Sequence, residues 1–416
     1  MPSKALLASA RLAHHMRTAQ ELGIEPVEPR IDTAKVFERV RAVQQRIAGT
    51  DDDPERFRAL GIDLRVGDPA TLTGPHTIRC GDDELEAKHI LLATGSRPAE
   101  PAISGLAEAG YLTSETVWDI PRAPASLLIL GGGPIAVELA QAFRRLGTTV
   151  TVLQKGERVL PRDEPELVDR LIARLRGEGV AIHTGVDADR ITAEDGLKVV
   201  HAGGDRWAAE EILVAAGRTP NTDGLGLEAL GIEVSARGVT VDDRSRTSVP
   251  SIYAVGDLAG RHRFTHSAAS EGVKAVRDMF FPGKGRFESL VPWATFTDPE
   301  LAHAGLTVEQ ARERHGDDVE LWRMELTHSD RARADGTDDG LLLVVCAKRK
   351  IVGAHVLAPA AGELIGELTL AIEHGMRFSD LASTIHVYPT LSTSIAQLAG
   401  EAAFEGAQRY KWLVRT

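Results

Sequence analysis

The stretch SLLILGGGPIAVELAQAFRRLGTTVTVLQKGERVLP, at residues 126–161, constrains the fold of this chain more than any other. Its apolar run at residues 127–130 is typical of a buried parallel strand. A glycine-rich turn and an amphipathic helix follow, and a second apolar strand begins at Thr149, after the helix stops at Gly147. This order of strand, glycine loop, helix and strand predicts a parallel α/β unit that binds a dinucleotide.

Three small residues of this loop fit the pattern G-x-G-x-x-A. Gly131 allows the tight turn after the strand, and Gly133 lets the backbone approach a pyrophosphate at the N-terminus of the helix. Ala136 allows the helix and the strand to pack closely. A glycine-rich turn without a ligand is the alternative interpretation.

The end of the second strand usually distinguishes NAD from NADP, because an acidic side chain there binds the ribose 2′-hydroxyl and repels a 2′-phosphate. Here the position holds Gln154, followed by Lys155 and Arg158. The absence of a carboxylate and the two nearby cations favour NADPH. Gln154 would also tolerate NADH, and both cations would also suit an exposed surface.

The composition is that of a chain with two or three globular domains, since 416 residues with 43% hydrophobic residues exceed one core. A net charge of −12 argues against partners such as nucleic acid or an anionic membrane. No apolar run reaches the roughly 18 residues of a membrane span. The only cysteines, Cys80 and Cys346, suit a reducing cytoplasm and exclude a disulfide framework. The spacing of the histidines predicts no metal site.

Three further strands end in a glycine turn. They are expected at residues 90–93, 212–215 and 252–255. The turns carry Thr94–Gly95–Ser96, Gly217–Arg218 and Gly256–Asp257, respectively. The last turn puts a carboxylate at the carboxyl edge of a sheet, where open α/β folds bind ligands. Each signal is weak by itself, but three around one dinucleotide motif strengthen the prediction of a cofactor-binding fold.

The pattern changes from Pro292 onward. A strand, a helix and a strand pair that turns at residues 348–350 are expected there. Helices at residues 361–374 and 393–408 follow. Strands grouped before helices indicate an α+β domain with a mostly antiparallel sheet.

In this order, the motifs resemble the pyridine nucleotide–disulfide oxidoreductases, the flavoproteins that include dihydrolipoamide dehydrogenase, glutathione reductase and mercuric reductase. The matching pieces cover nearly the whole chain. They are PSKALL, LLATGSRP, GGGPIAVELA, AAGRTPN, IYAVGDLAG, TFTDPELAHAGLT, DRARADG and IHVYPTLS. The resemblance is closest to bacterial enzymes similar to mercuric reductase that carry the DRA and YPT signatures.

The resemblance implies an α/β fold in three parts. An FAD-binding domain at residues 1–122 and 252–288 is interrupted by a Rossmann-like NAD(P)-binding domain at residues 123–251. An α+β dimerisation domain at residues 289–416 would form a homodimer. The implied cofactors are FAD and NADP or NAD. Hydride would pass from the nicotinamide to the flavin, and then to a disulfide or another small-molecule electron acceptor.

The family's functional residues map onto this sequence position by position. Lys4 would lie near the flavin and pair with Glu138, and Asp257 would bind the ribityl chain. Tyr388, His386 and Lys4 are the catalytic candidates. The cofactor-binding candidates are Lys4, Thr94, Gly95, Ser96, Gly131, Gly133, Pro134, Ile135, Ala136, Glu138, Gln154, Lys155, Arg158, Gly217, Arg218, Gly256 and Asp257.

Two expected motifs are missing from the beginning of the chain. The family's first FAD fingerprint, a strand followed by G-x-G-x-x-G, should precede PSKALL, and so should the redox pair C-x-x-x-x-C. Met1 matches the residue that follows the second cysteine. We therefore expect a sequence truncated at an internal methionine, with an incomplete FAD domain that lacks its first βαβ unit. The alternative is a catalytically incompetent, NAD(P)-binding, dimerising protein without flavin. A chain that holds FAD loosely and acts as a diaphorase is a third possibility.

The C-terminal signature also differs from the disulfide reductases, which carry His-Pro-Thr and a glutamate five residues past the histidine. Here Tyr388 precedes the proline and Thr393 stands at the glutamate position. His386, two residues earlier, would share a face with Tyr388 on a strand. A phenol is a weak base but a workable proton donor. A packed interface aromatic is the alternative role. The terminal RYKWLVRT lacks the adjacent cysteines of mercuric reductases, so mercury reduction is not expected.

Overall fold

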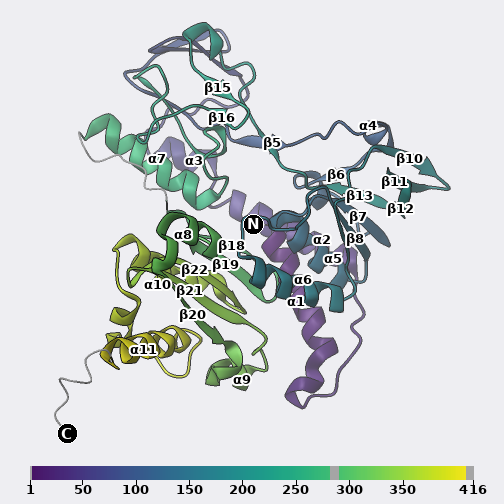
Figure 1. The fold of residues 1–416 in the computed structure, drawn as a ribbon. Helices are drawn as coiled ribbons and strands as arrows, with labels where there is room; N and C mark the ends of the chain where they lie inside the picture. Colours follow the sequence, from purple (N-terminus) through teal and green to yellow (C-terminus); the bar gives the residue numbers. More distant parts are fainter. Residues whose placement is uncertain (1, 282–289, 409–416) are drawn as a thin grey trace. The chain divides into compact units, whose positions relative to one another are not determined.

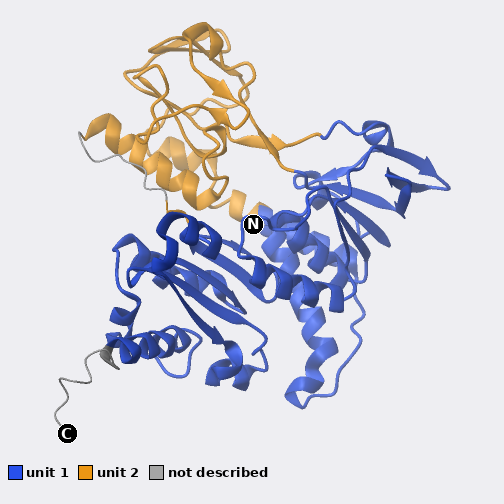
Figure 2. Cartoon of the chain, viewed as in Figure 1, with its two compact units in different colours: residues 1–44, 101–216, 292–416 blue, residues 45–100, 217–291 orange. Residues whose placement is uncertain are grey.

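The computed structural model describes residues 2–281 and 290–408. The expectations placed on Met1 and on RYKWLVRT lie outside these residues. The chain forms two compact units, which are coloured separately in Figure 2. Unit 1 comprises residues 1–44, 101–216 and 292–416, and unit 2 comprises residues 45–100 and 217–291. These units are defined by how densely their residues contact one another, whereas the expected domains were defined by the cofactor that each binds. The expected domain boundaries therefore stay a prediction.

Unit 1 contains the predicted dinucleotide-binding sheet. Its five strands have the order β6-β13-β7-β8-β9, and every neighbouring pair is parallel. The strands are β6 (Leu112–Thr113), β7 (Ser126–Leu130), β8 (Thr149–Gln154), β9 (Ala181–Thr184) and β13 (Glu211–Val214). Helix α5 (Pro134–Arg145) connects β7 to β8, and α6 (Pro165–Gly177) connects β8 to β9. The strand, loop, helix and strand expected from the sequence are therefore confirmed.

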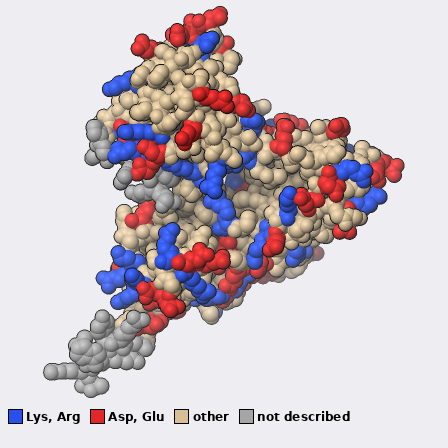
Figure 3. Space-filling view, turned by 45° about the horizontal axis from the view of Figure 1, so that its top comes forward, with Lys and Arg blue, Asp and Glu red and all other residues tan. Residues whose placement is uncertain are grey.

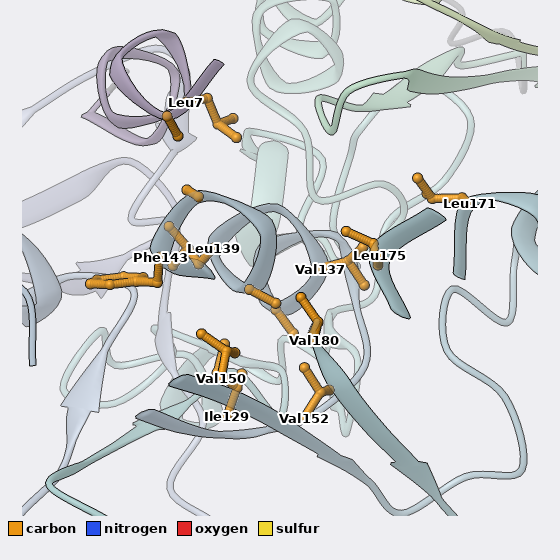
Figure 4. Close-up of a cluster of buried hydrophobic side chains, with 14 of the residues drawn as sticks. Leu7, Ile129, Val137, Leu139, Phe143, Val150, Val152, Leu171, Leu175 and Val180 are labelled. Atoms are coloured by element: carbon orange, nitrogen blue, oxygen red, sulfur yellow. The ribbon is translucent and has the colours of Figure 1, made fainter. Parts of the chain in front are cut away.

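A continuous apolar core joins this sheet to its helices (Figure 4). Ile129, Val150 and Val152 extend from β7 and β8 toward Leu139 and Phe143 of α5, and all five are buried. Each such side chain contributes about 1.5–3 kcal/mol by leaving water. Leu7 of α1 (Pro2–Thr18) joins the same cluster. The helix expected at the start of the sequence is thus packed against α5.

The C-terminal part of unit 1 is an antiparallel sheet of order β18-β19-β22-β21-β20. The strands are β18 (Trp293–Thr295), β19 (Glu300–Gly305), β20 (Val319–Glu325), β21 (Leu341–Ala347) and β22 (Lys350–Ala358). Its helices are α8 (Val308–His315), α9 (Asp330–Asp335), α10 (Ala361–Glu373) and α11 (Thr393–Gln408). The expected α+β architecture is confirmed. Sequence reasoning missed β20, whose alternation of charged and apolar residues is typical of an edge strand.

Unit 2 contains short sheets around a smaller core (Figure 1). Strands β4 (Ile90–Leu92) and β17 (Ile252–Ala254) pair in parallel, and α7 (Thr265–Phe280) follows β17. Strand β5 (Ser96–Pro98) pairs antiparallel with β14 (Arg218–Pro220). The remaining strands of this unit are β1 (Ala70–Gly74), β2 (Thr77–Cys80), β3 (Asp83–Glu86), β15 (Val234–Ser235) and β16 (Gly238–Val239).

The described residues also form three further α-helices and one small sheet. The helices are α2 (Thr33–Ala48), α3 (Pro54–Ala59) and α4 (Leu106–Ala109). The sheet belongs to unit 1 and consists of β10 (Arg190–Glu194), β11 (Leu197–Ala202) and β12 (Asp205–Ala209). On the face visible in Figure 3, acidic and basic side chains are interspersed.

A buried group of titratable side chains lies between the two sheets of unit 1. The indole Nε1 of Trp293 donates to Asp163 Oδ1 at 2.8 Å, and the Trp293 ring stacks on His303. The Nδ1 atoms of His303 and His355 are 3.1 Å apart. Burial raises the pKa of Asp163 from 3.8 to about 6. Burial lowers the pKa of His303 to about 3 and that of His355 to about 4.

The variant Asp163→Asn is expected to gain stability at alkaline pH. Because its folded pKa is raised, Asp163 binds more protons in the folded state between pH 3.8 and about 6, and its contribution to stability falls as pH rises through this window. Asparagine cannot ionise but still accepts from Trp293. The stabilisation should reach at most about 3 kcal/mol near pH 8 and shrink near pH 5.

Urea denaturation of both proteins at these two pH values measures the effect. The difference in unfolding free energy between the variant and the parent reports on Asp163 alone. The two histidines contribute equally to both proteins, and their lowered pKa values make stability rise with pH, opposite to the effect of Asp163. The exposed Asp82→Asn is the matched control. An equal free-energy difference at both pH values would refute the assignment.

Candidate cofactor and active site

Gly131 is fixed by the fold of the dinucleotide loop. Its φ of +119° lies in the region that favours glycine, and an added Cβ would lie 2.4 Å from the carbonyl oxygen of Ala215. This close approach occurs where β7 and β13 end side by side. A glycine here is therefore a requirement of the chain itself, with or without a ligand.

Gly133 has a different reason to be glycine. It is extended and forms the N-cap of α5, and a Cβ at this position would meet nothing within 4 Å. The open space lies at a helix N-terminus that begins with Pro134 and Ile135, where first-turn amides lack intrahelical acceptors and attract anions. Ala136 is fully buried against the sheet, as expected. These residues fit the pyrophosphate of a dinucleotide.

Gln154 ends β8 and is half-buried, whereas Lys155 and Arg158 after it are exposed. The Gln154 amide donates to the Arg158 carbonyl at 3.3 Å. Lys155 pairs with Asp187 at 2.8 Å, and Arg158 pairs with Asp169 at 2.6 Å. Such exposed ion pairs contribute little free energy, so both cations stay able to exchange a carboxylate for a phosphate. Their role in choosing NADP over NAD stays a prediction.

Lys4 and Glu138 form the expected pair. Lys4 Nζ lies 2.8 Å from Glu138 Oε2 and 4.1 Å from the centre of the Phe296 ring. The other carboxylate oxygen of Glu138 accepts from the Phe296 amide at 3.0 Å. Glu138 is buried, whereas the Lys4 side chain is 41% exposed. The buried carboxylate thus holds an ammonium group that remains accessible. Their catalytic and cofactor-binding roles stay predictions.

Unit 2 joins three of the candidate residues in one polar cluster. The Ser96 hydroxyl donates to Asp257 Oδ2 at 2.5 Å. Arg218 donates to the Ser96 hydroxyl and to its carbonyl oxygen, both at 2.7 Å, and its Nε lies 3.5 Å from Asp257. The ends of β4, β14 and β17 bring these residues together. Polar groups of this kind suit a polyol chain, which offers both donors and acceptors.

Two glycine turns shape this cluster. Gly95 and Gly256 have φ values of +69° and +67°, so each turn follows its strand through a conformation that glycine adopts readily. Thr94, before the first turn, donates from its hydroxyl to the Asn221 carbonyl at 2.8 Å. Gly217, with a φ of +125°, opens β14. The expected cofactor-binding role of Gly217 and Arg218, which belong to unit 2, stays a prediction.

Glu271 is a site residue that sequence reasoning missed. From α7 it accepts the Gly256 amide hydrogen at 2.6 Å, and it is fully buried. Burial raises the pKa of Glu271. The carboxylate therefore fixes the turn that presents Asp257. A glutamate among apolar positions of an amphipathic helix was the available signal, because buried carboxylates require a partner.

Tyr388 and His386 occupy an irregular loop at residues 384–390 instead of a strand. The expectation that they share a strand face is therefore wrong, because each side chain has its own partner. His386 Nε2 lies 2.9 Å from Glu367 Oε1, whereas the Tyr388 hydroxyl donates to Asp330 Oδ2 at 3.1 Å. The Tyr388 residue is 69% exposed. Sequence reasoning missed both carboxylates.

The two thiols have different environments. Cys346 lies on β21 and is fully buried, and burial raises its pKa to about 12. Cys80 is half-buried on β2 of unit 2. A thiol needs its thiolate form for nucleophilic chemistry, so Cys346 is inert at neutral pH. Within residues 2–281 and 290–408, no group of three or more histidine, cysteine or acidic side chains could hold a metal ion.

Among the helices of the described part of the chain, none combines the length and the apolar character that crossing a membrane requires.

Comparison with known proteins agrees with this geometry. The sequence profile of a family described as pyridine nucleotide-disulphide oxidoreductase matches residues 1–272, and that of its dimerisation domain matches residues 291–399. The chain is 35% identical to a dihydrolipoyl dehydrogenase of Thermus scotoductus over 96% of this chain and 87% of that protein. It is 33% identical to a mercuric reductase of Bacillus cereus over 95% of this chain and 63% of that protein.

Solved structures show the same likeness. LpdA from Mycobacterium tuberculosis superimposes with a TM-score of 0.88 at 28% identity, over 96% of this chain and 89% of that one. The Cu(II) complex of the HOCl-induced flavoprotein disulfide reductase RclA from Escherichia coli gives a TM-score of 0.84 at 26% identity, over 95% and 88%.

Proposed function

The chain belongs to the pyridine nucleotide-disulphide oxidoreductase family, and from this premise we propose that it oxidises NAD(P)H through bound FAD and reduces a small-molecule acceptor. Members of the family are oxidoreductases that bind FAD and NAD(P)H. When bound, the flavin supplies a carrier that takes hydride from the nicotinamide and returns electrons to the acceptor.

The observation that carries the proposal is the open space beside Gly133 at the N-terminus of α5, where an added Cβ would meet no atom within 4 Å. The loop thus has the shape and the dipole that a pyrophosphate needs. In the same unit, Glu138 holds Lys4, which we assign to the neighbourhood of the flavin. In unit 2, Ser96, Arg218 and Asp257 supply donors and acceptors for the flavin's polyol chain.

We propose that Cys80 and Cys346 are not the redox pair that passes electrons to the acceptor. Cys346 is fully buried, and burial raises its pKa to about 12. We assign the proton that accompanies the electrons to Tyr388, because its hydroxyl is accessible and carries a hydrogen at neutral pH. A quinone-like compound and a disulfide in solution are the classes that such a site can reduce with this proton, because each takes up two electrons and two protons; an oxidised metal ion would take up electrons alone.

A homodimer completes the proposal. The chain carries the family's dimerisation domain at residues 291–399. Tyr388 lies within this domain, and so do the exposed Ile385 and Val387 beside it. We propose that this apolar loop packs against a second copy, which places the loop beside the partner's cofactors.

The alternative is an NAD(P)-binding dimer that holds no flavin. The visible absorbance of the purified protein separates the two. Bound yellow flavin that is bleached anaerobically by NADPH supports the oxidoreductase. A colourless protein that binds NADPH, seen by nucleotide fluorescence, and that takes up no added FAD supports the alternative. Oxidised lipoamide, a benzoquinone and Cu(II) are the acceptors to compare.

NADPH is expected to reduce the flavin with a higher kcat/KM than NADH, because Gln154 places no carboxylate against the 2′-phosphate. Gln154→Asp should reverse the preference by about tenfold or more, equal to about 1.4 kcal/mol per tenfold. Stopped-flow bleaching with both nucleotides measures it. Asp187→Asn, which frees Lys155 from its ion pair, is the matched control and should leave NADPH preferred. An NADH preference in the parent protein would contradict the assignment.

A further inference from the structure

The far end of α1 has a second apolar face. Its inner face places Leu6, Leu7 and Ala10 in the core of unit 1. Leu12 and Met16, which are one turn apart on the helix, are exposed instead. The outer face of an amphipathic helix ordinarily carries polar residues. The apolar pair on the outer face of α1 therefore indicates a surface that is covered by something else.

The chain after α1 adds three apolar side chains at the same end of the helix. Leu22, Ile24 and Val27 are each more than half exposed. The Val27 amide donates to the Met16 carbonyl at 2.8 Å, so this segment folds back beside α1. We call residues 12–27 the α1 tip. Exposed apolar residues that are scattered singly are ordinary, whereas a cluster of them is typical of an interaction surface.

The α1 tip has a fixed backbone. The Ile24 amide donates to the Ala19 carbonyl at 3.1 Å. Arg17 Nη2 donates to Glu28 Oε1 at 2.7 Å, and its Nη1 donates to the Arg145 carbonyl of α5 at 2.6 Å. The apolar side chains of the tip are thus presented by an ordered segment. Such a surface loses little conformational entropy when a partner binds.

Helix α9 connects the α1 tip to the Tyr388 loop, which comprises residues 384–390. At the C-terminal end of α9, a Cβ added to Gly336 would lie 3.4 Å from Leu22 Cδ2. At its N-terminal end, Asp330 accepts from the Tyr388 hydroxyl at 3.1 Å. The six residues of α9 span about 9 Å, and Figure 1 shows the far end of α1 beside this helix. The α1 tip, α9 and the Tyr388 loop therefore form one continuous surface of unit 1.

The Tyr388 loop by itself is too small for a stable homodimer. Specific interfaces bury about 800 Å² of each partner and take about 20–30 residues from each side. Within the described residues, the loop, α10 and α11 expose few large apolar side chains, namely Leu370, Ile385, Val387, Tyr388 and Phe404. A second copy that packs on the loop must therefore cover neighbouring surface as well. The α1 tip supplies apolar surface next to it.

The charges of α9 favour a second copy of this chain as the partner. The helix sequence DRARAD exposes two carboxylates and two guanidinium groups, those of Asp330, Arg331, Arg333 and Asp335. Equal numbers of both signs can pair with the same helix of a second copy across a two-fold axis. Exposed ion pairs such as Arg331–Asp335 exchange partners at little cost. A partner with one predominant charge would instead meet like charges.

We propose that a second copy of this chain covers the α1 tip, α9 and the Tyr388 loop together. This contact rests on the homodimer of the proposed function. It adds to that homodimer the α1 tip, which lies outside the residues 291–399 that match the dimerisation domain. The apolar side chains of the tip form the centre of the added contact, and the charges of α9 form its polar rim.

Sedimentation velocity of the full chain with added FAD, over a dilution series, tests the proposal. Leu22→Glu and Ile24→Glu should each raise the dimer dissociation constant by about 100-fold or more, because each variant would bury a carboxylate without a partner. Both side chains are mostly exposed in the single chain, so the variants should keep their fold, which circular dichroism checks. Leu60→Glu is the matched control, because Leu60 is also exposed but lies on unit 2. It should leave the dissociation constant unchanged.

Val387→Glu separates the added contact from the homodimer itself. A dimeric parent that dissociates in Val387→Glu, but not in Leu22→Glu or Ile24→Glu, would overturn the role of the α1 tip and leave the homodimer standing. A parent that is monomeric at every concentration would refute the homodimer, and the added contact with it.

Hydrogen exchange of the parent protein decides the same question without a variant. The amides of residues 12–27 should exchange more slowly at high protein concentration than after dilution, whereas those of residues 60–66 should not change. Equal exchange of residues 12–27 at both concentrations would overturn the proposal. Exchange that slows only when phosphatidylcholine vesicles are added would show that a membrane covers this surface, and would overturn the proposal as well.

Discussion

Gly133→Ala is expected to weaken NADPH binding by about 10- to 100-fold, or about 1.4–2.8 kcal/mol, while the protein keeps its melting temperature. The new methyl group would meet no protein atom within 4 Å, and the extended backbone of Gly133 accepts any residue. It would instead occupy the space in which a pyrophosphate approaches the first turn of α5. Titration of the protein with NADPH, followed by nucleotide fluorescence, measures the loss.

Gly131→Ala is the matched comparison two residues earlier. Here the methyl group would lie 2.4 Å from the Ala215 carbonyl oxygen, and φ is +119°. Strain and overpacking should cost about 2–5 kcal/mol of folding free energy. The two variants should therefore separate, one losing binding and the other stability. Equal losses of stability would show that the space beside Gly133 serves the fold, and undiminished NADPH binding in Gly133→Ala would contradict the dinucleotide assignment.

This contrast shows what the sequence could predict. The spacing G-x-G-x-x-A between two apolar strands indicated the loop, the helix and the parallel sheet, because periodicity and glycine are local signals. The sequence also indicated the α+β sheet from Pro292 onward. It also gave Gly131 and Gly133 different reasons to be glycine, the tight turn and the approach of a pyrophosphate. It could not tell that a side chain at Gly131 would meet the carbonyl of Ala215, which comes directly after β13 and more than eighty residues away.

The residues that sequence reasoning missed share one property. Glu271, Glu367 and Asp330 act on a candidate residue from a neighbouring helix, at separations of 15, 19 and 58 residues. Glu271 had one signal, its place among apolar positions of an amphipathic helix, but the sequence names no partner for any of the three, because a solvated carboxylate on a helix is common. Burial is what distinguishes Glu271, and burial is a property of the folded chain. The expected strand at His386 was wrong, because residues 384–390 form an irregular loop. The sequence could not indicate this loop, since the contact of the His386 ring with Glu367 exists only in the folded chain.

Arg145→Leu is expected to destabilise unit 1 by about 3–5 kcal/mol, because it removes the cation that two carboxylates share in a buried site and leaves Glu178 with Arg174, at 3.3 Å, as its cation. Arg145 donates two hydrogen bonds to the Glu178 carboxylate, at 2.7 and 2.8 Å, and one to the Asp298 carboxylate at 2.7 Å. The Arg145 and Glu178 side chains are 4% and 9% exposed. Burial alone would raise the pKa of Asp298, but Arg145 overcomes it and lowers that pKa. Urea denaturation at neutral pH measures the loss.

Two control variants test whether the loss of stability comes from burial of the ion pair and from the charge of Arg145. Lys35→Met removes a cation from an exposed pair with Asp32 and should change stability by less than about 1 kcal/mol. Arg145→Lys keeps the charge but cannot form the bidentate contact with Glu178. Its loss of folding free energy should therefore lie between those of Lys35→Met and Arg145→Leu. Because Asp298 loses its cation in Arg145→Leu, its pKa should rise, and acid should then destabilise this variant less than the parent. An equal response to acid would mean that Arg145 acts through packing, since its long stem fills the space between α5 and the loop that carries Asp298.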